Sequence, residues 1–243
     1  MKQMKRKLLS GMMLIVLLFS GWKILTILTE NQHNQRILAD VQKVYQKQAQ
    51  QTRSVTSTKP AFVELKKINP DIKGWISIPD TAIDYPILQS SDNDFYLKHN
   101  YQKEIARAGS VFKDFRNQSE SEFNTILYGH NMKDGSMFAD LQNYLDEDFF
   151  NKHPTFDYET ETKSYQVEVF AAYETTTDFY YIETDFSQPQ AYSNYLTTIK
   201  QQSKFKTNVT VTDQDQIITL STCDTGFDYE KGRFVIQGKL IEK

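Results

Sequence analysis

The single cysteine of the 243-residue chain lies in the stretch TLSTCDTGFDYEKGRF, residues 219–234. Strand-like runs at 217–223 and 233–241 flank a polar loop, and if they pair as an antiparallel hairpin, Cys223 and Arg233 lie side by side. A neighbouring cation favours the reactive thiolate, and a guanidinium can bind the oxyanion that forms when a thiolate attacks a carbonyl. The spacing therefore predicts a nucleophile and its electrostatic partner.

A cysteine nucleophile also needs a group that transfers protons, and histidine is the usual one. Among the four histidines, His130 has the most suitable context, because TILYGHN places it directly after a strand-like run and a glycine. A loop residue at that position can aim its ring into a cleft. His33 and His153 lie in segments that predict solvated side chains, and His99 lies in the polar loop YLKHNY.

Structural interpretations of the same residues stay open at this point. Free cysteine is among the most buried residue types, so Cys223 also fits an inert core position in a strand. Arg233 also fits a solvated residue at a strand edge. The spacing does not show that His130 approaches the hairpin, so a catalytic site and a structural cysteine both fit the pattern.

Composition and charge limit the other classes of site and partner. One cysteine cannot form an intramolecular disulfide, and no cluster of Cys and His has the spacing of a zinc site, so we expect no metal and no cofactor. The net charge of −3 gives no electrostatic case for nucleic acid as a partner. Aromatic residues make up 13% of the chain, which suits a globular protein rich in β structure.

The N-terminus predicts a membrane anchor. Residues 1–7 form a basic tail, and residues 8–28 are an apolar run that would form about 30 Å of helix, enough to cross a bilayer. Lys23 lies near the outer end, where its charge can reach the headgroups. A cleaved signal peptide is the alternative, but the bulky Phe19 occupies a position where the cleavage site needs a small residue. The basic tail predicts a single-pass protein of the cell membrane with its N-terminus inside and the remaining chain outside.

The remaining chain divides into a stalk and a larger domain. Residues 29–60 are predicted to form a helical stalk and linker, with apolar residues at helical spacing and a linker signal in TRSVTSTKP. Residues 61–243 are predicted to form the larger domain. It is mainly β with added helices, a barrel or a sandwich. We expect strands at 74–78, 82–88, 109–112, 124–129, 164–177, 216–223 and 233–241, and helices at 136–150 and 189–203.

Taken together, these features resemble the sortase family, the cysteine transpeptidases of Gram-positive cell surfaces. The most specific pieces are TLSTC ending at Cys223, the hairpin return at Arg233, and YGHNMKDGSMFADL around His130. The class B variety fits best, because class B enzymes have helices before the barrel and a longer helix before the final strands. The resemblance implies an eight-stranded sortase-type β-barrel, preceded by a transmembrane helix and a helical stalk, with the three residues meeting at one end.

The resemblance also implies a two-step acyl transfer. Cys223 would attack the carbonyl of a Thr in an NPxTN-like C-terminal sorting signal, while Arg233 steadies the oxyanion and His130 protonates the leaving amine. The acceptor would be an amine of peptidoglycan, in the precursor lipid II or in the cross-bridge. The partners would be secreted proteins with such a signal, including haem-iron uptake proteins. The implied substrate contacts are Asn93, Leu97, Tyr128, Thr177, Tyr181, Ile182 and Ser221.

Three alternatives remain beside this interpretation. Some class B enzymes polymerise pilins and use a Lys side chain as the amine. A membrane-tethered binding module without catalysis, or a cysteine hydrolase of another fold, would also contain a lone cysteine. Some class B enzymes carry an acidic residue two positions after the cysteine, whereas here Asp224 follows it directly and Thr225 comes next. We therefore assign no third residue that orients His130.

Overall fold

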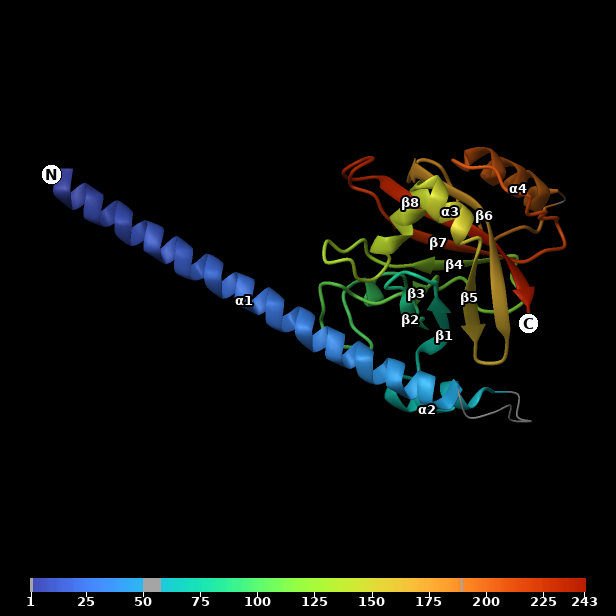
Figure 1. Ribbon diagram of the computed structural model, residues 1–243, viewed down its shortest axis with the longest axis horizontal. Helices are drawn as coiled ribbons and strands as arrows, with labels where there is room; N and C mark the ends of the chain where they lie inside the picture. The colour runs from blue at the N-terminus through green and yellow to red at the C-terminus, as the bar shows by residue number, and fades with distance from the viewer. Residues whose placement is uncertain (1, 50–57, 189) are drawn as a thin grey trace.

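The computed structural model describes residues 2–49, 58–188 and 190–243. In chain order the elements are α1 (Lys2–Ala49), α2 (Pro60–Ile68), β1 (Ile72–Ser77), β2 (Asp84–Leu88), η1 (Phe95–Leu97), β3 (Phe112–Lys113), β4 (Asn124–Tyr128), η2 (Ala139–Leu145), α3 (Glu147–Lys152), β5 (Thr155–Thr160), β6 (Ser164–Thr176), α4 (Ala191–Gln202), β7 (Ile217–Cys223) and β8 (Gly232–Glu242). The eight strands close into a barrel in the order β1-β2-β3-β4-β7-β8-β6-β5, and a long helix projects from it (Figure 1). The predicted eight-stranded barrel is confirmed.

Alternating side chains explain why the strands form. In β6, Tyr165, Val167 and Val169 are buried inside the barrel, whereas Gln166 between them is exposed. The sequence prediction missed β5, where Phe156 and the residues at alternate positions after it are buried in the same way. It also placed a strand at 109–112, but the ladder there consists of β3 alone, two residues long.

The pairing of β4 with β7 positions two of the predicted catalytic residues, His130 and Cys223. The two strands run parallel, with Tyr128 opposite Ser221 at the end of the ladder. Parallel neighbours end at the same edge of a sheet. His130 and Cys223 each come two residues after that last pair, so both lie at one edge of the barrel although 93 positions separate them.

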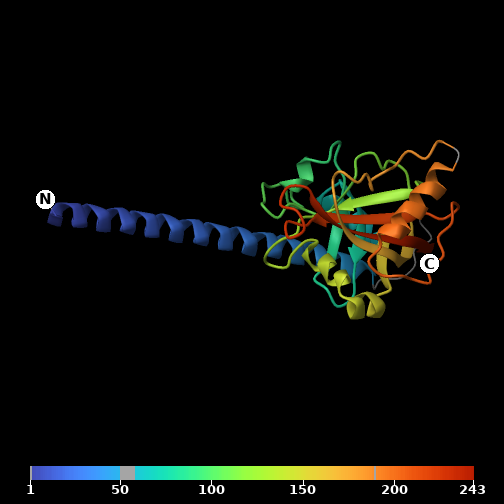
Figure 2. The ribbon, with the colours of Figure 1, turned by 90° about the horizontal axis from the view of Figure 1, so that it is seen from above.

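The C-terminal half of α1 packs against the barrel. Ile37 and Val41 are buried against the barrel, and the ring of Tyr45 stacks on Trp75 with 3.9 Å between ring centroids. The N-terminal half of the helix extends away from the barrel (Figures 1 and 2). By length and composition, α1 is the one helix among the described residues that could cross a membrane. Most of the predicted linker, 50–57, lies outside the described residues.

One helix prediction needs correction and a second is confirmed. The helix predicted at 136–150 is instead the 3-10 helix η2 followed by α3, because Asp146 has an extended backbone between them. Its side chain accepts a hydrogen bond of 2.9 Å from the backbone N–H of Phe149, which caps the N-terminus of α3. The helix predicted at 189–203 is α4, and Pro189 lies outside the described residues.

Candidate active site

Cys223 and Arg233 face each other across the β7–β8 hairpin. The register pairs the two residues directly, as the sequence predicts. Their neighbours Thr222 and Phe234 are buried and hold the strand ends in place, while Cys223 itself is half-buried. Arg233 Nη1 donates a hydrogen bond of 2.8 Å to the carbonyl of Gly232, and none of the described carboxylates forms an ion pair with the guanidinium. The cation is therefore available to an oxyanion beside the thiol.

His130 is held by backbone contacts. Its Nε2 lies 2.8 Å from the carbonyl oxygen of Leu97, and because a carbonyl only accepts, Nε2 carries the proton. In the neutral ring Nδ1 is then the basic nitrogen. The next residue, Asn131, donates from Nδ2 to the carbonyl of Cys223 at 3.0 Å. The histidine loop is thus joined to the strand that carries the thiol.

A pocket of about 410 Å³ opens at this edge of the barrel. Cys223, His130 and Arg233 all line it. So do the seven side chains that were predicted as substrate contacts, which are Asn93, Leu97, Tyr128, Thr177, Tyr181, Ile182 and Ser221. The structure therefore brings all ten predicted site residues to one cavity, from η1, β4, β7, β8 and the loops around them.

Comparison with known proteins identifies the family. The sequence model of the sortase domain matches residues 76–241. The chain belongs to the sortase family. It is 59% identical to sortase B of Listeria monocytogenes over 238 residues, which cover 98% of this chain and 97% of the relative. Sortase B of Staphylococcus aureus is 37% identical over 233 residues, covering 95% and 94% of the two chains.

Solved structures agree with this assignment. The S. aureus sortase B–substrate complex has a TM-score of 0.82 and 37% identity, and the match covers 88% of this chain and 99% of that chain. A sortase B structure from Bacillus anthracis has a TM-score of 0.81 and 45% identity, covering 89% of this chain and 100% of that one. The prediction of a class B cysteine transpeptidase, an enzyme type that attaches proteins to the cell wall, is therefore confirmed.

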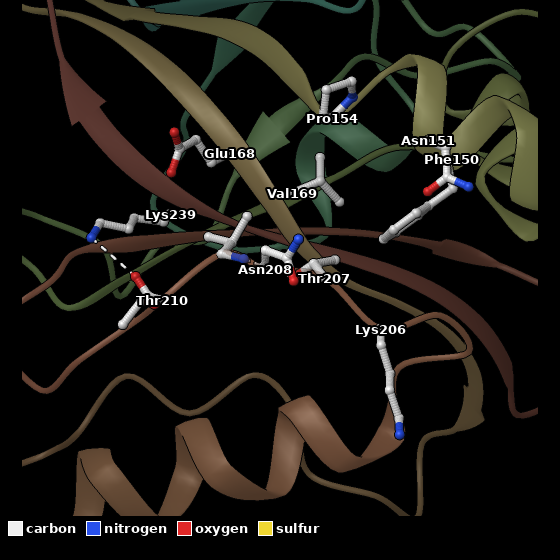
Figure 3. A pocket seen from close by; sticks show the side chains of 11 residues that line it. Phe150, Asn151, Pro154, Glu168, Val169, Lys206, Thr207, Asn208, Thr210 and Lys239 are labelled. Atoms are coloured by element: carbon white, nitrogen blue, oxygen red, sulfur yellow. Dashed lines mark hydrogen bonds between the residues drawn. The ribbon is translucent and has the colours of Figure 1, made fainter.

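A second, larger cavity lies elsewhere on this sortase. A hollow of about 590 Å³ lies between β6, β8 and the segment 206–210 (Figure 3). Lys239 lines one side of it and donates a hydrogen bond to the carbonyl of Thr210 at 3.1 Å. None of the predicted site residues lines this larger hollow. Within the described residues, a nucleophile, a base and a cation come together in the 410 Å³ pocket, so we select it by its chemistry rather than by its size.

The other histidines have structural roles. His33 pairs with Glu104 at 2.7 Å. The prediction of a solvated His153 is wrong, because its side chain is only 10% exposed and its Nε2 lies 3.0 Å from Asp80 Oδ2. Its ring also stacks on Phe149 of α3, with 3.9 Å between centroids. His99 stacks on Phe95 in a similar way, with 4.0 Å between centroids.

Sequence reasoning missed a buried carboxylate that organises the pocket wall. Asp114 Oδ2 accepts hydrogen bonds from the Tyr128 hydroxyl at 2.8 Å and from Asn93 Nδ2 at 3.1 Å. Burial alone would raise the pKa of Asp114, but bonds from Arg116 and Tyr128 outweigh it and hold the pKa below its usual value. Arg116 in turn donates to the carbonyl of Ile182 at 3.1 Å. One ion pair therefore positions three pocket residues.

Removal of the Asp114 carboxylate should destabilise the folded protein. We expect Asp114→Ala to lower the free energy of unfolding by about 2–4 kcal/mol, because it leaves three donors without their shared acceptor in a buried site. Denaturant titration measures the loss. The matched control Glu242→Ala removes an exposed partner of Lys163 and should cost less than about 1 kcal/mol. Equal losses in the two variants would contradict this role.

Asp224, the residue after the nucleophile, organises the β7–β8 loop. The side chain is buried, and its Oδ1 accepts from the backbone N–H groups of Gly226 and Phe227 at 3.1 and 3.2 Å. No donor to its Oδ2 is present in the described part of the chain, and the Glu174 carboxyl faces it. Burial, and then the charge of Asp224, raise the pKa of Glu174 above 4.5. A hydrogen bond between the two carboxyl groups forms only when one of them holds a proton.

Because Glu174 faces Asp224, we expect the stability of the fold to depend on pH. The folded-state pKa of Glu174 is raised, so protonated Glu174 contributes fully to the free energy of unfolding at acidic pH. This contribution is lost as the pH rises through the folded-state pKa. We expect Glu174→Gln to raise the free energy of unfolding at pH 7 by a few tenths of a kcal/mol, since the side chain is partly solvated. At pH 4 the gain should vanish. A gain of the same size at both pH values in denaturant titrations would refute the assignment.

Proposed function

We propose that this sortase is a membrane-anchored enzyme that cleaves an NPxTN-like sorting signal after Thr and transfers the acyl group to an amine of peptidoglycan. The observation that carries the proposal is the register of Cys223 with Arg233 beside the His130 loop in one pocket. Its cargo would be secreted surface proteins, including haem-iron uptake proteins. The acceptor would be the amine of lipid II or of the cross-bridge.

In the first half of the reaction, the thiolate of Cys223 attacks the carbonyl carbon of the Thr. The carbonyl electrons move onto oxygen, where the Arg233 guanidinium binds the oxyanion. Collapse of the tetrahedral adduct breaks the C–N bond, and His130 gives a proton to the leaving amine. The product is a thioester on Cys223.

The second half reverses these roles. An amine attacks the thioester carbonyl, and neutral His130 takes the proton that the new amide bond releases. The thiolate of Cys223 leaves with its electron pair and is ready for another cycle. The basic Nδ1 of the His130 ring, left free by the Leu97 contact, is the nitrogen suited to this proton transfer.

The pocket wall suits a short peptide. Leu97 and Ile182 offer apolar contacts, and the hydroxyl groups of Tyr181 and Ser221 lie 2.7 Å apart in a hydrogen bond. Asn93 donates a hydrogen bond to the carboxylate of Asp114, which fixes its side chain. We propose that these residues, with Tyr128 and Thr177, contact the sorting signal. A solved structure of S. aureus sortase B is described as a substrate complex, which supports substrate binding by this fold.

The acceptor and the topology complete the proposal. A solved sortase B is described as complexed with triglycine, which supports an oligoglycine amine as acceptor. The apolar stretch 8–28 of α1 is unburied over its most apolar window, which supports a membrane span. We assign 1–7 to the cytoplasm, 29–60 to the stalk and linker, and 61–243 to an extracytoplasmic catalytic domain.

A peptide panel tests the substrate. The full chain in detergent is mixed with NPxTN and LPxTG peptides, with or without triglycine, and products are identified by mass spectrometry. We expect cleavage after Thr in the NPxTN peptide and a product that gains triglycine. A Lys-containing pilin peptide in place of triglycine tests the pilin alternative. Absence of cleavage in every peptide, or hydrolysis without any amine product, would exclude the proposed transfer.

Substitution of Arg233 should lower kcat/KM both when it removes the charge and when it keeps the charge but changes the shape of the side chain. We expect Arg233→Ala to lower kcat/KM by about 10²–10³-fold, because the oxyanion loses its cation. Arg233→Lys should recover little of this, since a point charge cannot reproduce the planar fork of the guanidinium. The control Lys231→Ala removes an exposed loop cation paired with Asp178 and should leave kcat/KM within about twofold of the parent. Full activity in Arg233→Lys would argue for charge alone.

A further inference from the structure

Three loops lie at the end of the barrel that faces the N-terminal half of α1. They are the segments 102–107, 131–136 and 225–231, and both ribbon views place them on that side (Figures 1 and 2). The second segment follows His130, and the third joins Cys223 to Arg233. The catalytic end of the barrel is therefore also the end nearest the proposed membrane span.

Hydrogen bonds to α1 fix where the first two of these loops lie along the helix. Glu30 accepts a hydrogen bond of 2.7 Å from the backbone N–H of Arg107, and Asn31 donates to Asp134 at 3.2 Å. The proposed span ends at Leu28, only two residues before the first of these contacts. At about 1.5 Å of helix per residue, the first two loops lie within roughly 5 Å of the end of the span, measured along the helix.

Large apolar side chains are exposed on two of these loops, 102–107 and 225–231. Ile105 is 85% exposed and Tyr229 is 84% exposed, the two highest values for large apolar residues outside α1 in the described part of the chain. Phe227 is 51% exposed beside Tyr229. Aromatic side chains such as tyrosine are enriched where a membrane meets water. The formal charges of the three loops cancel, so charge does not oppose contact with lipid.

We propose that this rim, defined by Ile105, Phe227 and Tyr229, rests in the interface of the bilayer that α1 crosses. The partner is a phospholipid surface, bound through apolar contact rather than through charge. The pocket mouth then opens beside the membrane, where an acceptor amine carried on a lipid can reach Cys223 without leaving the bilayer. This inference rests on the membrane anchoring proposed above.

The single cysteine makes a direct test simple. In a Cys223→Ala background, Ile105→Cys and Tyr229→Cys each receive a fluorescent label on the full chain, which is then placed in phosphatidylcholine vesicles. Lipids with nitroxide-labelled acyl chains quench labels that contact the bilayer. Leu17→Cys, within the proposed span, is the positive control. Gln214→Cys, exposed before the start of β7 at the far end of the barrel, is the matched negative control.

The inference predicts that the two rim labels are quenched at least about twofold more than the Gln214 label, with little change between low and high salt. Rim labels quenched no more than the Gln214 label, while the Leu17 label is quenched, would overturn the inference and leave the anchoring intact. An unquenched Leu17 label would contradict the anchoring and the inference with it.

An activity measurement distinguishes the effect of the rim on membrane contact from its effect on peptide cleavage. The double variant Ile105→Ser/Tyr229→Ser should cleave a soluble sorting peptide in detergent as fast as the parent. In vesicles its transfer to a lipid-linked amine should fall about threefold or more. Equal transfer by parent and variant in vesicles would overturn the inference. Failure of the parent to cleave in detergent would instead contradict the proposed function.

Discussion

Replacement of Cys223 with alanine is expected to abolish peptide cleavage, with kcat/KM lower by at least about 10³-fold. The thiol is the only one in the chain, and it is the group that the proposed mechanism acylates. A fluorogenic sorting-signal peptide, cleaved between its two dyes, measures the loss. Because Cys223 ends β7 and is only half-buried, the variant should keep the fold.

A chemical control accompanies this variant. A thiol-directed methanethiosulfonate reagent can modify only Cys223, so modification of the parent should abolish cleavage and a reducing agent should restore it. Prior binding of a sorting peptide should slow the modification. Retained cleavage after complete modification, or in Cys223→Ala, would show that the cysteine is structural.

His130→Gln is expected to lower kcat by about 10²–10⁴-fold, the usual range for a group that transfers protons in both steps. Glutamine can still donate a hydrogen bond to the carbonyl of Leu97 but cannot exchange a proton, so the variant separates chemistry from positioning. The same fluorogenic peptide, at saturating concentration, measures kcat.

The control for this variant is a histidine outside the pocket. His153→Gln disturbs a contact with Asp80 and the end of α3, so it should reduce stability while kcat stays within about twofold of the parent. A kcat for His130→Gln as high as that of His153→Gln would remove His130 from the proposed mechanism.

Local patterns were sufficient to predict the hairpin at the centre of the site. The alternation in β7 and β8 and the polar loop between them predicted the pairing of Cys223 with Arg233, which the register confirms. The position of His130 depended instead on the parallel pairing of β4 with β7. Such a pairing joins segments 93 positions apart and leaves no local signal, so the family resemblance was needed to place the histidine.

Other features depended on side-chain hydrogen bonds that the sequence pattern did not predict. The role of Asp114 requires Asn93 and Tyr128 to arrive from two separate segments, and only the run DFR after a short strand hinted at a local ion pair. The two helical segments at 139–152 bury Leu141, Tyr144 and Phe150, and the break between them lies at the cap residue Asp146. A carboxylate that bonds across elements decided the first outcome, and a local helix cap decided the second.

The acyl-enzyme itself gives the most direct test of the central claim. The purified chain is mixed with the sorting-signal peptide in the absence of an amine, quenched in acid, and analysed by intact-protein and peptide mass spectrometry. The proposed mechanism predicts a mass gain equal to the peptide fragment ending in Thr, located on Cys223, that disappears within seconds to minutes after triglycine is added. Cleavage of the peptide with no adduct on Cys223 at any time, or an adduct that triglycine cannot discharge, would contradict it.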